Sequence, residues 1–262
     1  MEIYDEAGRF NVRGSLLWER IKCVRGAAGT AFLGSNHRLR AALSRGLSGK
    51  PLKIGVVRGS ISHGHGSSRI GETDWASLLQ KWASKSLQNC TLRNGSVPGT
   101  PSAYMAMCLD MAIDQDVDIV IAEYVVNDGK DNSIDNNLRL MEFERLTCSH
   151  GVTYPRNDSD WHPFHNGLED VYGALAPYYD LPWLSFRAAT FRRAAFLEDP
   201  EFTYKDIMNS KVAHDYLHPS DFGHQILADL VIWLFRQTAL DLILRPWSSD
   251  DEELLQERMP TM

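Results

Sequence analysis

The sequence predicts an α/β fold: a three-layer, doubly wound and mostly parallel sheet. Short apolar runs that suit buried strands alternate with longer segments whose apolar residues recur at helical spacing. The near-continuous apolarity of 117–126 indicates a strand buried on both faces, which is typical of a parallel sheet covered by helices. In such sheets a functional site lies beyond the carboxyl ends of the strands.

The first elements alternate between helix and strand. Residues 36–47 predict a helix that Gly49 and Pro51 end. Residues 52–57 are short, apolar and rich in β-branched side chains, which predicts a buried strand. In 74–87 the apolar residues again recur at helical spacing, so a helix is expected to follow that strand.

The middle of the chain repeats this order. Residues 90–95 predict a weak, short strand, and 101–113 predict a helix with Pro101 near its first turn. Residues 117–126 are then the strongest strand of the sequence.

The second half predicts helices at 136–146 and 168–180, a short strand at 181–186, and a long last helix from Pro219 to about residue 244. Residues 147–167 between the first two helices have the composition of a loop.

Composition excludes some functions. The chain has 262 residues, of which 44% are hydrophobic and 23% charged, as in an ordinary globular protein. Its net charge is −7, so the basic face of a nucleic-acid-binding protein is not expected. No apolar secretory segment follows Met1, and the apolar stretch 226–235 is too short to span a bilayer. We expect no nucleic-acid partner, no membrane span and, by default, a cytoplasmic location; the oligomeric state is not indicated.

Potential metal ligands occur without a metal-binding pattern. The four cysteines lie far apart with no CxxC pair, and we interpret them as free thiols. His162 and His165 form an H-x-x-H pair in a loop, but no carboxylate or cysteine completes a ligand set. We therefore expect no metal and no cofactor. The remaining histidines near the motifs are interpreted as loop or surface residues: His63, His65, His214 and His224.

A lone serine, Ser60, follows the first buried strand directly. A phosphate-binding loop would require a lysine that is missing, and a dinucleotide-binding loop would require glycine where Arg69 stands. The G-x-S-x-G elbow of α/β-hydrolases is not matched by residues 59–62. On this segment alone, a serine that caps a helix is the simpler interpretation.

Other segments favour a catalytic interpretation of Ser60. Gly99 lies in the loop after the second strand, Asn127 follows the third strand, and Asp215 and His218 precede the last helix. A doubly wound fold gathers such loops at one edge of the sheet. Each segment is weak evidence alone, since Asn-Asp-Gly, for example, is an ordinary turn in which Asp128 is a turn residue. The order of these segments along the chain, with serine first, then glycine, asparagine and the Asp/His pair, is a much more specific pattern than any one of them.

In this order the chain resembles the SGNH (GDSL-type) hydrolase family over about 52–240. The matching blocks are Arg58-Gly59-Ser60-Ile61-Ser62, Asn94 to Gly99, Val126-Asn127-Asp128, and Asp215 to Pro219. The resemblance implies the flavodoxin-like fold of that family, with 51–245 as the hydrolase-like domain. An N-terminal extension with a helical segment (1–50) would precede it, and a charged tail (246–262) would follow.

The resemblance also implies residue roles. Ser60 resembles the nucleophile, His218 the general base and Asp215 the residue that orients the imidazole. The oxyanion hole would consist of the backbone N–H groups of Ser60 and Gly99 and the side chain of Asn127.

The chain departs from the family pattern at two places. Arg58 and Gly59 replace the Gly-Asp that precedes the family serine, so Arg58 would crowd the turn or add charge at the cleft. The family has a further buried strand after the helix that matches 136–146, yet 147–167 contains only the poor candidate 151–154. This leaves two alternatives: either the sheet lacks one central strand, or an exon-sized piece that would form it is missing from this sequence.

The sequence thus favours a serine esterase or acyl hydrolase that acts on a lipid, an acetylated carbohydrate or another small ester. Two alternatives stay open. One is an O-acyltransferase with the same triad, which only an acceptor assay would separate. The other is a non-catalytic relative that binds a ligand without turnover.

Overall fold

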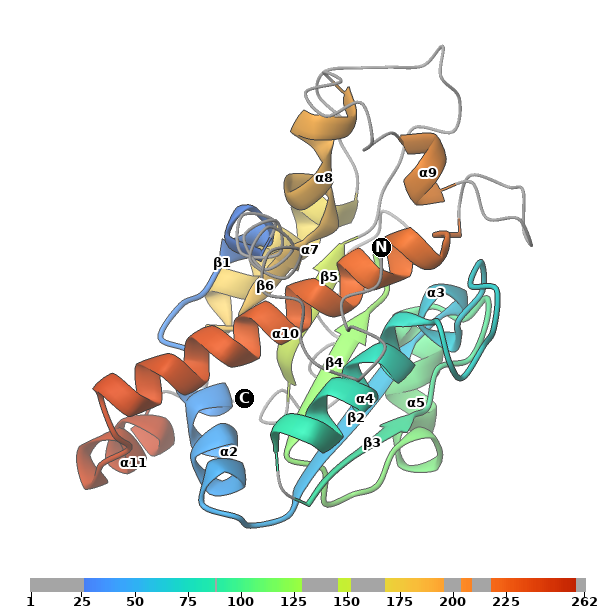
Figure 1. Ribbon diagram of the computed structural model, residues 1–262. Helices are drawn as coiled ribbons and strands as arrows, with labels where there is room; N and C mark the ends of the chain where they lie inside the picture. The colour runs from blue at the N-terminus through green and yellow to red at the C-terminus, as the bar shows by residue number, and fades with distance from the viewer. Residues whose placement is uncertain are drawn as a thin grey trace, which may run out of the picture.

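The computed structural model describes residues 26–87, 89–128, 146–151, 168–195, 204–208 and 218–257. Within them one six-stranded sheet has the order β1-β6-β5-β4-β2-β3 (Figure 1). All neighbouring strands are parallel except β1, which pairs antiparallel with β6. The strands are β1 (Thr30–Phe32), β2 (Leu52–Arg58), β3 (Cys90–Asn94), β4 (Ile119–Glu123), β5 (Leu146–Gly151) and β6 (Trp183–Ser185). The predicted α/β, mostly parallel sheet is confirmed.

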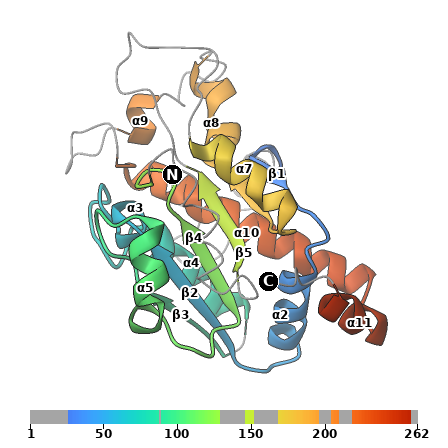
Figure 2. The same ribbon diagram turned by 180° about the vertical axis from the view of Figure 1, so that it is seen from behind.

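Helices cover both faces of the sheet (Figures 1 and 2). One face carries α2 (His37–Leu47), α4 (Trp75–Ser86) and α10 (Asp221–Leu244), and the other carries α5 (Ser102–Ala112) and α7 (Leu168–Tyr178). The remaining helices are α3 (Ser60–His63), α8 (Phe186–Ala195), α9 (Tyr204–Met208) and α11 (Ser249–Glu257).

The side chains of the central strands alternate between two cores. On β4, Ile119 and Ile121 pack in the core beneath α4 and α10, whereas Val120 and Ala122 pack in the core beneath α5 and α7. Both faces are therefore apolar, as the near-continuous hydrophobic run 117–126 predicted. Full burial of each large aliphatic side chain contributes about 1.5–3 kcal/mol.

The expectation that the sheet lacks a central strand was wrong, because β5 occupies that place. Residues 146–151 pair in parallel with β4 on one side and with β6 on the other. The segment LTCSHG has few β-branched residues, so its composition does not identify a strand. A central strand is held by backbone hydrogen bonds to both neighbours, which do not depend on side-chain type. The predicted helix 136–146 lies outside the described residues except for Leu146, which begins β5.

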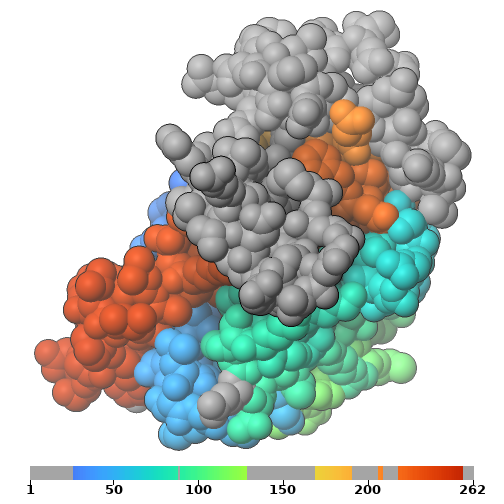
Figure 3. Space-filling model, viewed as in Figure 1, coloured from blue at the N-terminus to red at the C-terminus, as the bar shows by residue number. Residues whose placement is uncertain are grey.

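Residues on either side of the predicted hydrolase-like domain pack against it. Leu39 and Leu43 of α2 are buried in the main core, and Arg40 forms an ion pair with Asp241 of α10. The α11 helix lies beside α2 (Figure 1), and Asp251 is 3.4 Å from His37 Nε2. In the space-filling view the red atoms near the C-terminus adjoin the blue atoms of α2 (Figure 3). The described part of the predicted extension thus contributes an edge strand and a core helix, and residues 249–257 of the charged tail form a helix.

Free thiols are confirmed for Cys90 and Cys108. Burial raises the pKa of Cys90 to about 11, so this thiol stays protonated and unreactive at neutral pH. The other two cysteines, Cys23 and Cys148, have no described side chain.

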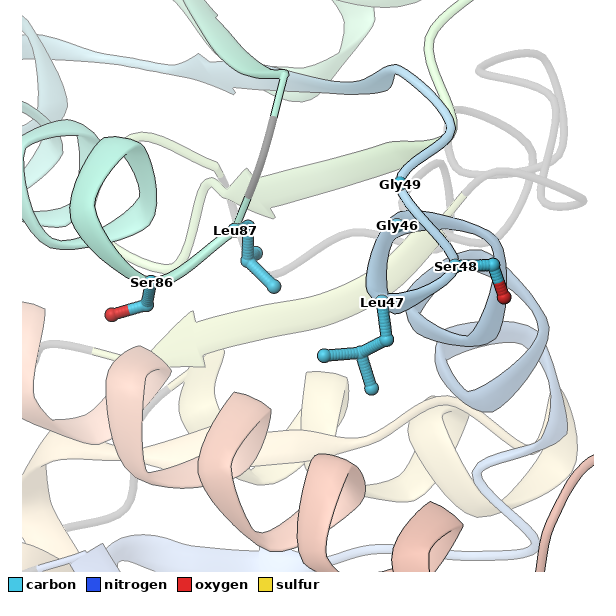
Figure 4. A pocket seen from close by; sticks show the side chains of 6 residues that line it. All are labelled: Gly46, Leu47, Ser48, Gly49, Ser86 and Leu87. Atoms are coloured by element: carbon cyan, nitrogen blue, oxygen red, sulfur yellow. The ribbon is translucent and has the colours of Figure 1, made fainter.

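A cavity of about 350 Å³ lies at the amino ends of β2 and β3 (Figure 4). The last residues of α2 and α4 line it, together with Ser48 and Gly49, and none of these side chains is charged. Ser60 follows the opposite, carboxyl end of β2, so this cavity is separate from the candidate site. Across the described ranges, no helix is both long and apolar enough to cross a membrane.

Candidate active site

Ser60 occupies the first position of α3, directly beyond the carboxyl end of β2. Gly59 is the residue before the helix, and Gly64 ends it in the left-handed conformation at φ 106°. The carbonyl of Ser60 accepts a hydrogen bond of 3.0 Å from the backbone N–H of His65. This short helical turn fixes the backbone of Ser60 and leaves its side chain half-buried.

The ring of His218 meets the hydroxyl of Ser60. His218 Nε2 and Ser60 Oγ are 2.8 Å apart, although 158 positions separate the two residues. Gly66 explains how the two loops approach so closely. It has φ 91°, and a Cβ at this position would overlap the carbonyl oxygen of Pro219 and press on His218.

Asn127 reaches the same place from the loop after β4. This strand ends at Glu123, because the carbonyl of Tyr124 accepts hydrogen bonds from the N–H groups of Asn127 and Asp128, each 2.9 Å long. The side-chain amide of Asn127 lies against Gly59, where an added Cβ would overlap Oδ1. An amide group therefore sits beside the backbone that leads into Ser60.

The loop before Gly99 is anchored to β2 and α3. The N–H of Val97 donates to the carbonyl of Arg58 at 2.9 Å, and Asn94 Nδ2 donates to the carbonyl of Ser62 at 2.6 Å. Gly99 follows this anchored stretch in the left-handed conformation at φ 73°, which favours glycine. A Cβ added at Gly99 would meet no atom of the described residues within 4 Å.

Asp128 has a structural role. Its Oδ1 accepts a hydrogen bond of 2.7 Å from the backbone N–H of Ser102, the first residue of α5. Its other oxygen accepts from the hydroxyl of Tyr172. Burial, and then the charge of Asp128, raise the pKa of Tyr172 well above its ordinary value, so this hydroxyl remains a donor. Asp128 thus ties the Asn127 loop to the start of α5.

Several predicted residues lie outside the described part of the chain. These are Asp215, the predicted partner of His218, and the histidines His162, His165 and His214. In the part that is described, no group of three His, Cys, Asp or Glu side chains is arranged to hold a metal ion.

Two sequence interpretations are corrected here. Arg58 neither crowds the turn nor charges the cleft, because its side chain is fully buried and forms an ion pair with Glu123. His224 is neither a loop nor a surface residue, because it lies in α10 and is fully buried. Its Nδ1 accepts a hydrogen bond from the N–H of Trp75 at 3.3 Å, and its Nε2 lies 3.0 Å from the carbonyl oxygen of His65. Periodicity alone does not reveal a polar side chain within an apolar core.

Replacement of Gly59 by alanine should lower the kcat of a reaction catalysed at this site by about tenfold to hundredfold. The new methyl group would overlap the amide of Asn127 and displace it. The matched control is Gly173→Ala in α7, where an added Cβ meets Trp183 at an ordinary 3.6 Å. Steady-state kinetics of both variants test this, and an unchanged kcat in Gly59→Ala would contradict a role for Asn127.

Comparison with known proteins supports the fold. No family model and no curated protein matches the sequence. A two-domain esterase (CEX) active on acetylated mannans matches with a TM-score of 0.68 at 22% identity, over 81% of this chain and 56% of that one. The present chain therefore spans little more than half of that esterase.

Two other solved structures share the fold at lower similarity. The lipase/acylhydrolase from Enterococcus faecalis has a TM-score of 0.52 at 16% identity, over 71% of this chain and 94% of that one. The acetyl xylan esterase AlAXEase has a TM-score of 0.51 at 16% identity, over 69% and 98%. The fold expected from the resemblance to SGNH hydrolases is confirmed.

Proposed function

We propose that this protein is a serine hydrolase that cleaves carboxylic esters through a covalent acyl-enzyme. The observation that carries the proposal is the 2.8 Å approach of His218 Nε2 to Ser60 Oγ. A serine hydroxyl is a weak nucleophile, and an imidazole in hydrogen-bond contact is the base that activates it. Asp215 would accept a hydrogen bond from the other ring nitrogen of His218 and hold the ring in place.

In the first half of the reaction His218 takes the proton of Ser60 as Oγ bonds to the ester carbonyl carbon. The carbonyl oxygen becomes an oxyanion, for which we assign the N–H groups of Ser60 and Gly99 and the Asn127 amide as donors. Collapse of this intermediate breaks the ester bond, and His218 gives the proton to the departing alcohol. Water then attacks the acyl-enzyme with His218 again as base, and the acid is released with Ser60 restored.

For the substrate we propose a short acyl ester on a carbohydrate. Support comes from the two-domain esterase active on acetylated mannans, which has the highest TM-score among the structures compared above. The test compares p-nitrophenyl acetate, p-nitrophenyl palmitate and an acetylated mannan. We expect release of acetate from the first and third, and at least about tenfold slower cleavage of the palmitate. Preference for the palmitate would instead favour a lipid substrate.

Acyl transfer and ligand binding without turnover stay as alternatives. An acyltransferase would show faster p-nitrophenol release when a sugar acceptor is added, with the acyl group recovered on the sugar. A non-catalytic relative would bind an acetylated oligosaccharide without releasing acetate. A missing central strand or an arginine exposed in the turn before Ser60 would have favoured the non-catalytic alternative, but β5 completes the sheet and the Arg58 side chain is fully buried.

A further inference from the structure

We propose that the buried ion pair of Arg58 and Glu123 positions the nucleophile and the oxyanion-hole amide relative to each other; this rests on the proposed function. Arg58 is the last residue of β2, Glu123 is the last residue of β4, and the two are register partners on neighbouring strands. Their side chains are 0% and 1% exposed. The pair therefore joins the ends of the two central strands from beneath the candidate site.

The residues that follow this pair are those of the site. Ser60 comes two positions after Arg58, and Asn127 comes four positions after Glu123. The two loops then meet where Gly59 touches the Asn127 amide. A shift of either strand end would change the distance between the Ser60 backbone and that amide.

Arg58 also holds α3 through a side-chain hydroxyl. Its Nη1 donates to Ser62 Oγ at 3.1 Å, and Trp75 Nε1 of α4 donates to the same oxygen at 2.7 Å. Ser62 is fully buried and lies in the same helical turn as Ser60. This shared acceptor restrains the rotation of α3, and therefore the direction of the Ser60 side chain.

A positioning role suits the chemistry of the pair better than a stabilising one. Removing two charges from water has a cost that their attraction does not always recover, so an apolar pair of similar volume is often at least as stable. An apolar pair, however, makes contacts that have no preferred direction. The planar guanidinium has a fixed geometry: here it is paired with a carboxylate on β4 and donates a hydrogen bond to a hydroxyl on α3.

The test is the double variant Arg58→Met/Glu123→Leu, with Arg40→Met/Asp241→Leu as the matched control. The control pair joins α2 to α10 and carries no residue of the site. We expect the first double variant to keep its denaturation midpoint, to lose about tenfold to hundredfold in kcat and to change KM by less than about threefold. The control should keep the kcat of the wild type.

A folded Arg58→Met/Glu123→Leu variant with the kcat of the wild type would overturn the proposal. If this variant does not fold, the variant Ser62→Ala provides the test instead. It leaves the ion pair intact and removes only the hydroxyl that accepts hydrogen bonds from Arg58 and Trp75. We expect it to lose at least about threefold in kcat at unchanged KM, and an unchanged kcat would overturn the proposal. A folded wild type that hydrolyses no ester would instead overturn the proposed function, and this inference with it.

Discussion

Replacement of Ser60 by alanine should reduce ester hydrolysis by at least about 10⁴-fold in kcat while the protein remains folded. The variant lacks the oxygen that lies 2.8 Å from His218 Nε2, so no acyl-enzyme can form. The hydroxyl is only half-buried, so its removal should change the free energy of unfolding by less than about 1 kcal/mol. Kinetics with p-nitrophenyl acetate and circular dichroism measure the two effects separately.

The matched control for this variant is Ser68→Ala. Ser68 lies in the exposed loop after α3, where its hydroxyl donates to Asp221 rather than to a group of the site. The control should hydrolyse the ester at the rate of the wild type. Equal activity of the wild type and Ser60→Ala would show that another group performs the hydrolysis and would remove Ser60 from the nucleophile role.

Lowering the pH from about 7 to 4.5 should remove about 2–3 kcal/mol of stability through His224 alone. Burial lowers the pKa of this imidazole from 6.5 to about 4 in the folded protein. Between these two values the unfolded chain binds a proton that the folded protein does not. Stability is therefore complete above about pH 6.5 and is lost as the pH falls toward 4.

The variant His224→Gln tests this. An amide can accept from the N–H of Trp75 and donate to the carbonyl of His65, as the neutral ring does, but it does not titrate. Urea denaturation at pH 7 and pH 4.5 measures the free energy of unfolding at each pH. The decrease between the two pH values should be about 2 kcal/mol smaller in the variant than in the wild type. Equal losses in both proteins would contradict a neutral, buried His224.

The carboxylate of Asp221 contributes to stability at lower pH. The pKa of Asp221 stays below 3.8, despite partial burial, because of hydrogen bonds from Ser68 and Thr73. Its contribution to stability is present above about pH 3.8 and is lost below it. Asp221 therefore contributes little to the difference in stability between pH 7 and pH 4.5.

The sequence was sufficient to predict most strands of the sheet and the proximity of Ser60 and His218. Periodicity located the helices and strands that bury large apolar areas, such as β4 and α10. It extended β4 to residue 126, because Val125 and Val126 are apolar; the strand ends at Glu123, where the turn around Tyr124 begins. Loop order, rather than any single motif, placed Ser60 and His218 together.

Other features depend on partners distant in the chain, which a local pattern does not encode. The β5 strand forms because β4 and β6 offer backbone partners on both sides. Arg58 and Glu123 are separated in sequence by α3, α4, β3 and α5, and only the strand register brings them together. The buried position of His224 follows from the packing of α10 against α4. The N–H of Trp75, the first residue of α4, donates a hydrogen bond to the His224 ring instead of to a carbonyl of its own helix.

The most direct test of the account is covalent labelling by a fluorophosphonate, which reacts with serines activated by a base. Peptide mass spectrometry of the treated, folded protein would locate the phosphonyl group. We predict a single adduct on Ser60 that is lost in His218→Ala, because the imidazole no longer removes the proton of the hydroxyl. An unlabelled Ser60, or equal labelling with and without His218, would contradict the claim that these two residues form the catalytic centre.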